Sequence, residues 1–415
     1  MFNSLITKMV RREFSRVMKF EEGGQGEIPP GDASPRLLYL HVPFCEKLCP
    51  YCSFHRLVFQ EALGHSYFAA LRKEIRMYQA RGYAFRGLYV GGGTPTIMIE
   101  ELEETIACAR QCFPLQEISV ETNPNHLTEQ NITALKRSGV KRLSVGIQSF
   151  DNVLLKAMDR YDKYGSGEEI TAKLRNAKGH FDTLNADMIF NFPIQDLKVL
   201  NKDLDILLDL EMDQITYYPL MVSDSTRQRV SNTLGRVDYG KEETLYRQIE
   251  KRLTPSYNLS SAWCFSRRQT VSIIDEYIVD YDEYAGLGSG AIGFLNGVCY
   301  ANTFDINRYI AMLDRDEAPI WASRHFTEKD KIRYDFLMKL FATRLNLPEL
   351  QKKYAGSMYR YLWPDMLAFF LLGGLRYEAP YLHLTRRGHY LWVIMMREFF
   401  IAVNNFRDFC RNGLI

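Results

Sequence analysis

Short apolar runs, each followed by a polar stretch long enough for a helix, recur along the first half of this chain. Runs of this length are typical of buried strands, and strands that alternate with helices form a parallel sheet with right-handed crossovers. The sequence therefore predicts an α/β fold whose ligands lie at the carboxyl ends of the strands. The strand-like runs are residues 36–44, 88–90, 117–124, 142–150, 183–193 and 214–220.

Polar or small residues end these runs, at the edge where ligands of a parallel sheet gather. Taken singly, each is more typical of a satisfied buried polar group, but together they predict a polar pocket. After the run at 88–90, glycines 91–93 allow the backbone to approach a ligand before Thr94 and Pro95 begin a helix. The polar residues are Glu121, Asn123, Gln148, Ser149, Asp187 and Tyr218.

Three of the eight cysteines lie close together in the segment FCEKLCPYC, at Cys45, Cys49 and Cys52. A structural zinc site takes four ligands and would need His41 or His55 as well, and a disulfide would use only two of the thiols. Three thiolates can instead bind three irons of a cubane cluster and leave the fourth iron open for a substrate or cofactor. We therefore expect an open iron–sulfur cluster, with zinc as the alternative.

Composition narrows the class of protein. The 415 residues, 46% hydrophobic and 25% charged, suffice for one large domain and a smaller second one. The net charge of +2 predicts no partner by itself, and we expect no nucleic acid. The other five cysteines show no secreted disulfide framework and no signal peptide opens the chain, so we expect a reducing cytoplasm. No segment reaches about 18 uninterrupted apolar residues, so no membrane span is predicted.

Five motifs, in this order, resemble the radical S-adenosylmethionine (SAM) enzymes related to oxygen-independent coproporphyrinogen III dehydrogenase and the heme chaperones. The resemblance covers about residues 36–310 and implies a partial (β/α)6 barrel. In that family the open iron of a 4Fe-4S cluster binds SAM. An electron from a donor such as flavodoxin or ferredoxin then cleaves SAM to methionine and a 5′-deoxyadenosyl radical. The motifs are the cysteine loop, GGGTPT (91–96), VETNP (120–124), SVGIQSF (144–150) and DMIFNFP (187–193).

The resemblance also implies roles for individual residues. Cys45, Cys49 and Cys52 would bind the cluster, and Tyr39 would lie near the sulfonium of SAM. The glycine-rich segment 284–302 resembles a further family segment, and Gly288 within it would contact a second SAM molecule. The remaining positions that match family contacts to SAM are Gly92, Gly93, Thr94, Glu121, Gln148, Arg160 and Asp187.

Departures from the family's patterns bear on function. The dehydrogenase carries a further cysteine in a C-x-C pattern, whereas Ser53 and Phe54 follow Cys52 here. The heme chaperone's HNxxYW motif is replaced by SSAWCFSRR at residues 260–268. A third branch, methyltransferases that use two SAM molecules, fits the simple CPYC loop. Residues 384–400 also resemble the tails of family members that methylate menaquinone at ring carbon 8.

We therefore expect a C-methyltransferase that uses two SAM molecules to methylate menaquinone, a lipid-soluble substrate. The base that removes the ring proton stays open among His55, Tyr218 and Tyr300. Two alternatives belong to other classes: a porphyrin enzyme that catalyses oxidative decarboxylation or ring opening, and a heme carrier that leaves SAM uncleaved. Only the methyltransferase must release S-adenosylhomocysteine.

The two ends of the chain differ from its centre. Residues 1–20 place apolar side chains on one helical stripe and most basic ones elsewhere. This pattern is typical of an interfacial helix in peripheral contact with a membrane, and equally of a helix that packs on the domain. The region after about residue 325 has a helical pattern rich in aromatics. The predicted parts are an N-terminal helix and linker (1–35), a radical SAM core (36–310) and a helical C-terminal domain (311–415).

Overall fold

The computed structural model describes residues 2–22, 26–32, 34–268 and 280–412. At its centre, six strands lie side by side in chain order and run parallel to one another. The α/β fold predicted from the alternating pattern is thus confirmed. The strands are β2 (Arg36–Val42), β5 (Phe85–Gly92), β6 (Glu117–Thr122), β7 (Arg142–Gln148), β8 (Thr183–Phe190) and β9 (Gln214–Pro219).

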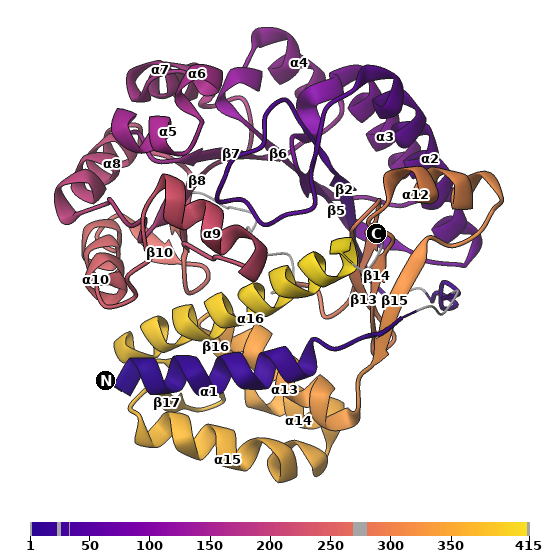
Figure 1. The fold of residues 1–415 in the computed structure, drawn as a ribbon. Helices are drawn as coiled ribbons and strands as arrows, with labels where there is room; N and C mark the ends of the chain where they lie inside the picture. The colour runs from indigo at the N-terminus through magenta and orange to yellow at the C-terminus, as the bar shows by residue number, and fades with distance from the viewer. Residues whose placement is uncertain (1, 23–25, 33, 269–279, 413–415) are drawn as a thin grey trace.

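Helices connect these strands and cover the outer side of the curved sheet (Figure 1). Side chains of a covered parallel strand are buried on both faces. In β2, Leu38, Leu40 and Val42 are fully buried on one face, and Leu37 and His41 are buried on the other. The covering helices include α2 (Glu61–Ala80), α3 (Ile99–Cys112), α4 (Glu129–Arg137), α7 (Gly167–Ala177), α8 (Leu197–Asp209) and α10 (Glu242–Leu253).

The sheet continues beyond both ends of the parallel set. β12 (Tyr284–Leu287) runs parallel to β2, and β13 (Ile292–Leu295), β14 (Val298–Asn302) and β15 (Ile320–His325) follow it as antiparallel neighbours. At the opposite end, β9 is followed by β11 (Cys264–Arg267) and β10 (Tyr257–Leu259). The predicted boundary at residue 310 falls inside α12 (Ile306–Asp314), between two strands of one sheet. The domain limits therefore stay a prediction.

The C-terminal region is mainly helical, as predicted, and contains a small antiparallel sheet. Its core is aromatic: the ring of Trp392 packs against Phe369 at 4.8 Å and against Phe336 at 5.9 Å. In Figure 1 the long helix α16 runs across the molecule between the main sheet and the other C-terminal helices. The elements are α13 (Glu328–Phe341), β16 (Arg344–Asn346), α14 (Leu347–Tyr354), α15 (Ser357–Leu371), β17 (Leu375–Glu378), β18 (Tyr381–Leu384) and α16 (Arg386–Asn412).

The N-terminal stripe forms α1 (Phe2–Val17), which packs along α16. The Phe14 ring meets Phe399 edge to face at 5.5 Å, and Arg11 Nε lies 2.6 Å from the buried carboxylate of Glu398. Of the two interpretations of this segment, packing on the domain is the one that the structure supports. After α1, the short strand β1 (Glu21–Glu22) joins the edge of the sheet beside β15.

Met1 and residues 23–25 and 33 of the predicted linker lie outside the described residues. In the described part of the chain, no helix combines the length and the apolar character needed to cross a bilayer.

Candidate active site

The cysteine segment leaves the carboxyl end of β2 and folds back beneath the neighbouring strand β5. The N–H of Phe59 donates to the carbonyl of Cys45 at 2.9 Å, and the N–H of Thr94 donates to the carbonyl of Phe44 at 2.8 Å. The first bond closes the loop on itself, and the second fixes the start of the loop to the glycine-rich turn. Cys45 and Cys49 are buried, Cys52 is half-buried, and all three line a cavity of about 360 Å³.

Cationic groups surround the three thiols. Arg56 donates to the carbonyls of Cys49 and Cys52 at 2.7 and 2.5 Å, and Arg160 Nη1 lies 3.8 Å from Cys49 Sγ. Arg56 Nε, Arg160 Nε and Lys163 Nζ are buried and have no hydrogen-bond partner among the described residues. Buried cations that keep a nitrogen without a hydrogen-bond partner fit a site that holds a negatively charged group, such as a thiolate-bound iron–sulfur cluster.

The protonation of Cys45 bears on how a metal would bind. Burial, and then the neighbouring Cys52, raise the pKa of Cys45 to about 11. Cys45 is therefore a neutral thiol at neutral pH while no metal is bound. Because a metal binds the thiolate form, cluster assembly has to displace this proton.

The zinc alternative finds no support in the geometry. Within the described ranges, no group of three or more His, Cys, Asp or Glu side chains is placed to hold a single metal ion. His41 Nε2 instead lies 2.9 Å from the carbonyl of His55, and His55 Nε2 lies 3.2 Å from Ser289 Oγ. Three separate thiolates suit a cluster, in which each iron takes one of them.

The glycine-rich turn approaches the cysteine loop closely enough to require glycine. A Cβ on Gly93 would lie 2.5 Å from the carbonyl oxygen of Phe44 and 3.0 Å from Cys45 Sγ. Gly92 has φ of +120°, and a Cβ there would lie 2.8 Å from the His41 ring. The predicted close backbone approach at this turn is therefore present, and the turn forms part of the cavity wall.

Two carboxylates at the strand ends belong to the same cavity. Glu121, at the end of β6, accepts from Tyr89 Oη at 2.9 Å and from the N–H of Gly92 at 3.0 Å. Asp187, in β8, accepts from Ser144 Oγ at 2.7 Å and from Asn185 Nδ2 at 2.8 Å. These bonds hold both carboxylates in fixed positions, where they can accept hydrogen bonds from the amino and hydroxyl groups of a cofactor.

Tyr39 and His41 form a hydrogen-bonded pair on β2. The His55 carbonyl can only accept, so His41 Nε2 carries the proton and its Nδ1 accepts from Tyr39 Oη at 2.9 Å. Burial lowers the pKa of His41 to about 4, which keeps the ring neutral. Tyr39 is thereby oriented at the cavity wall.

Gln148 and Arg160 reach the cavity by less regular backbone. Gln148 has φ of +74°, and the pairing of β7 with β8 shifts register next to it. Arg160, just before the short helix α6 (Tyr161–Tyr164), donates to the carbonyl of Gly146 at 2.5 Å and lies over the ring of Tyr164 at 4.1 Å. Neither position is visible in strand periodicity.

The cavity brings together most of the predicted site residues, which come from the six parallel strands and from the segments that follow them. Thr94 is not among the residues that line the cavity. It lies behind the cavity wall, and its hydroxyl is 3.8 Å from Cys45 Sγ. The predicted residues that line the cavity are Tyr39, Cys45, Cys49, Cys52, Gly92, Gly93, Glu121, Asn123, Gln148, Arg160, Asp187 and Tyr218.

Several predicted residues are placed elsewhere. The N–H of Gly288 donates to Glu74 at 2.8 Å in a buried turn, and Gly290 lines the cavity instead. The position of Gly288 thus lends no support to a contact with a second SAM molecule. Ser149 bonds to Asp203 at 2.8 Å, and Tyr300 bonds to Tyr78 at 2.8 Å, both away from the cavity lining. Of the three bases considered, only Tyr218 lines the cavity.

A further part of the cavity wall, called here the aromatic chamber, consists of aromatic side chains. The sequence patterns did not predict this part of the wall. The walls of the chamber come from the residue before β11 and from β13, α13 and α16, which are distant in sequence. Arg407 of α16 also lies here, 5.0 Å from the centre of the Phe54 ring. The aromatic content of the C-terminal region was the only available signal. The residues concerned include Trp263, Phe294, Tyr334, Phe399 and Phe400.

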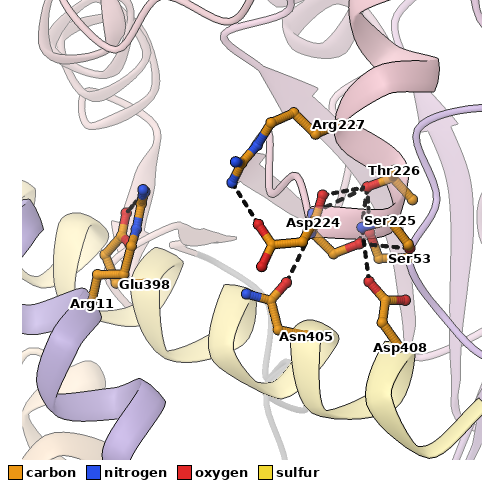
Figure 2. A network of polar contacts seen from close by, with 10 residues as sticks. Arg11, Ser53, Asp224, Ser225, Thr226, Arg227, Glu398, Asn405 and Asp408 are labelled. Carbon is orange, nitrogen blue, oxygen red and sulfur yellow. Dashed lines mark hydrogen bonds and ion pairs between the residues drawn. The ribbon is translucent and has the colours of Figure 1, made fainter. Parts of the chain in front are cut away.

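Helix α16 is fastened to the cysteine loop through α9 (Asp224–Thr233), as Figure 2 shows. Asn405 Oδ1 accepts from the N–H of Asp224 at 2.9 Å, and Asp408 accepts from the N–H of Ser225 at 3.2 Å. Thr226 Oγ1 lies 3.2 Å from Ser53 Oγ, directly after Cys52. Two side chains of α16 therefore cap the N-terminus of α9. Other side chains of α16, among them Val403 and Asn404, line the cavity.

Comparisons with known proteins agree with this arrangement. Residues 39–205 match the model of the radical SAM superfamily. The chain is 30% identical to the heme chaperone HemW of Lactococcus lactis over 285 residues, 66% of this chain and 74% of that protein. It is 29% identical to an oxygen-independent coproporphyrinogen III oxidase of Bradyrhizobium diazoefficiens over 338 residues, 76% of this chain and 74% of that protein.

A solved structure has the same fold. Coproporphyrinogen III oxidase (HemN) from Escherichia coli superposes with a TM-score of 0.76 and 21% identity, over 92% of this chain and 95% of that chain. The helical C-terminal region and the parallel sheet are therefore shared with a radical SAM enzyme.

These relatives overturn the predicted methylation of menaquinone. They are named as heme chaperones and coproporphyrinogen oxidases, which match the alternative functions that the sequence left open. The prediction was wrong because it relied on the absence of two short motifs, on the CPYC loop and on a short C-terminal resemblance, whereas the relatives match over most of the chain. The chain belongs to the radical SAM superfamily, in the family that contains the heme chaperone HemW and the oxygen-independent coproporphyrinogen III oxidases.

Proposed function

We propose that this chain is a radical SAM enzyme that acts on a tetrapyrrole of the porphyrinogen type. The observation that carries the proposal is the single cavity, in which three loop cysteines and an aromatic chamber share one space. A reactive group formed at the cysteine end would meet a substrate without crossing solvent. The names of the relatives support a tetrapyrrole as that substrate.

Cys45, Cys49 and Cys52 would hold a 4Fe-4S cluster, and Tyr39, Gly92, Gly93, Glu121, Gln148 and Asp187 would hold SAM. When bound, this pair supplies a 5′-deoxyadenosyl radical after an electron arrives from a donor such as flavodoxin or ferredoxin. Arg56, Arg160 and Lys163 offset the charge of the thiolates.

The chamber residues orient the substrate and exclude water. Trp263 and Phe400 lie with ring centres 6.0 Å apart, and Trp263 and Tyr218 lie 5.6 Å apart. Aromatic faces of this kind suit a large substrate built of several unsaturated rings, such as the four pyrroles of a porphyrinogen. α16 covers the chamber and so limits the access of water, which protects a radical from side reactions.

Anaerobic reconstitution with SAM, reductant and coproporphyrinogen III tests the proposal. We expect about four irons per chain, and 5′-deoxyadenosine whose yield rises with substrate. The Cys49→Ala chain is the matched control and should form none. A wild-type chain that holds a cluster but forms no more 5′-deoxyadenosine with the tetrapyrrole than without it would contradict the proposed substrate.

A heme carrier is the second candidate function. Two relatives that are named as heme chaperones favour this function. The chain covers 74% and 96% of the lengths of these two proteins. Against it, the segment 260–268 lacks the chaperone's HNxxYW motif. Titration with heme separates the candidates: stoichiometric heme binding with SAM left intact would support the carrier.

A further inference from the structure

Helix α15 carries a row of large apolar side chains on its solvent side. Trp363 is 59% exposed and Leu371 is 79% exposed. A spacing of four residues keeps such side chains on one face of a helix. The adjacent face, about 100° around the helix, carries Met358, Leu362 and Met366 and packs into the core. The exposed row, called here the α15 stripe, consists of Tyr359, Trp363, Leu367, Phe370 and Leu371.

The size of the α15 stripe limits what can cover it. Its exposed apolar surface amounts to roughly 500 Å², taking about 150–250 Å² for each large side chain. Single apolar patches on monomers reach about 300–600 Å², and those at the upper end are often functional. A stable protein dimer buries about 800 Å² on each partner, more than this one narrow face offers.

Basic side chains outnumber acidic ones in the region around the α15 stripe. Of the seven Lys or Arg residues in 344–387, three are paired with acids, namely Lys353, Arg376 and Arg386. Among the described residues of this region, the exposed basic side chains without an ion pair are Arg344, Lys352 and Arg360, against the single exposed acid without one, Glu349. On α15 itself, Arg360 is the charged residue among the exposed positions, and the single acid, Asp365, is paired with Arg333 at 3.1 Å. A symmetric dimer through this face would bring the basic groups of two copies together, which is unfavourable. An anionic surface would instead neutralise them.

We propose that the α15 stripe docks on an anionic lipid surface. Trp and Tyr side chains favour the layer between headgroups and acyl chains, and Leu and Phe side chains below them favour the apolar interior. Basic groups beside the stripe add attraction to anionic headgroups. α15 lies at the edge of the molecule in Figure 1, and the docking site goes beyond the proposed function without resting on it.

Cosedimentation of the full chain with phosphatidylcholine vesicles, with and without phosphatidylglycerol, tests this inference. We expect binding to the anionic vesicles that weakens as salt is added, because salt screens the basic groups. The Trp363→Ser and Leu371→Ser double variant should bind roughly tenfold more weakly or worse, since it loses apolar burial. Val153→Ser on α5 (Asn152–Ala157) is the matched control, because Val153 is 67% exposed and α5 lies at the opposite end of the molecule.

Two results would overturn the docking site. One is equal vesicle binding by the double variant and the wild type, with both folded by circular dichroism. The other is a concentration-dependent dimer in sedimentation velocity that the double variant abolishes, which would make the stripe an interface between copies of the chain. SAM cleavage should be the same in all variants, so a failure of the proposed activity leaves this test intact.

Discussion

At the scale of single residues, the site depends on close approaches that few side chains permit. Gly93 is the clearest case, because a Cβ there would overlap a carbonyl of the cysteine loop and crowd a cluster thiol. Buried ionisable groups are the second kind of constraint. Glu74 accepts hydrogen bonds from Tyr309, Asn302 and the N–H of Gly288, behind the wall of the cavity.

Gly93→Ala should destabilise the cysteine loop by about 1–3 kcal/mol, because overpacking forces the backbone to shift. Since Cys45 moves with that loop, iron content after reconstitution should also fall. Gly356→Ala is the control, because a Cβ at Gly356 meets nothing within 4 Å. Thermal unfolding and iron analysis measure both effects, and full iron content in Gly93→Ala would show that the close approach is dispensable.

Glu74 should make stability depend on pH. Burial raises the pKa of its carboxyl from 4.5 to about 7 in the folded protein. Between these values the folded state binds more protons than the unfolded state, so the free energy of unfolding should fall as pH rises from about 5 to about 7. Urea titrations across this range should give a shallower fall for Glu74→Gln, although the amide, facing three donors, lowers stability at every pH. Identical slopes for both proteins would exclude this role.

At the scale of elements, α16 joins parts of the chain that are far apart in sequence. Its polar side chains cap α9, its aromatic side chains line the cavity, and Glu398 pairs with Arg11 of α1. Figure 2 shows the cap and the pair along one helix. α16 is therefore both a wall of the cavity and a fastening for the cysteine loop.

Removing the cap should loosen α16. Asn405→Ala and Asp408→Ala should each cost about 1 kcal/mol, as the loss of a helix N-cap does. Hydrogen exchange should then quicken in α9 and in the last turns of α16. Asn232→Ala, on the exposed side of α9, should change stability by less than about 0.5 kcal/mol. Unchanged exchange in the cap variants would mean that apolar packing alone holds α16.

At the scale of the whole molecule, one sheet spans the predicted boundary at residue 310. β15 lies beyond that residue and pairs with β14, and the C-terminal helices supply part of the cavity wall. A chain that ends at 310 would expose the edge of β14 and the apolar side of the cavity. The core and the C-terminal region therefore depend on each other for a closed site.

A chain truncated after residue 310 should aggregate or fail to unfold cooperatively, and should retain far fewer than about four irons. Size-exclusion chromatography and iron analysis beside the full chain provide the measurement. A monomeric truncated chain with a full cluster would instead support the predicted domain limit.

The sequence by itself determined the parallel strands, the cysteine loop and most of the polar rim. These features are local: strand periodicity is carried by neighbouring residues, and C-x3-C-x2-C spacing lies within eight positions of the chain. The family motifs also predict that Glu121, Gln148 and Asp187 share one site, and all three line the cavity.

Only the tertiary structure decided how α1 packs, which aromatic residues form the chamber and which glycine reaches it. Each depends on contacts between distant segments, such as Asp224 with Asn405, 181 positions apart. Periodicity records which face of an element is buried but not which partner buries it. For the same reason the short C-terminal resemblance misled the choice of substrate. Its residues Phe399 and Phe400 line the cavity, and only the tertiary structure shows this.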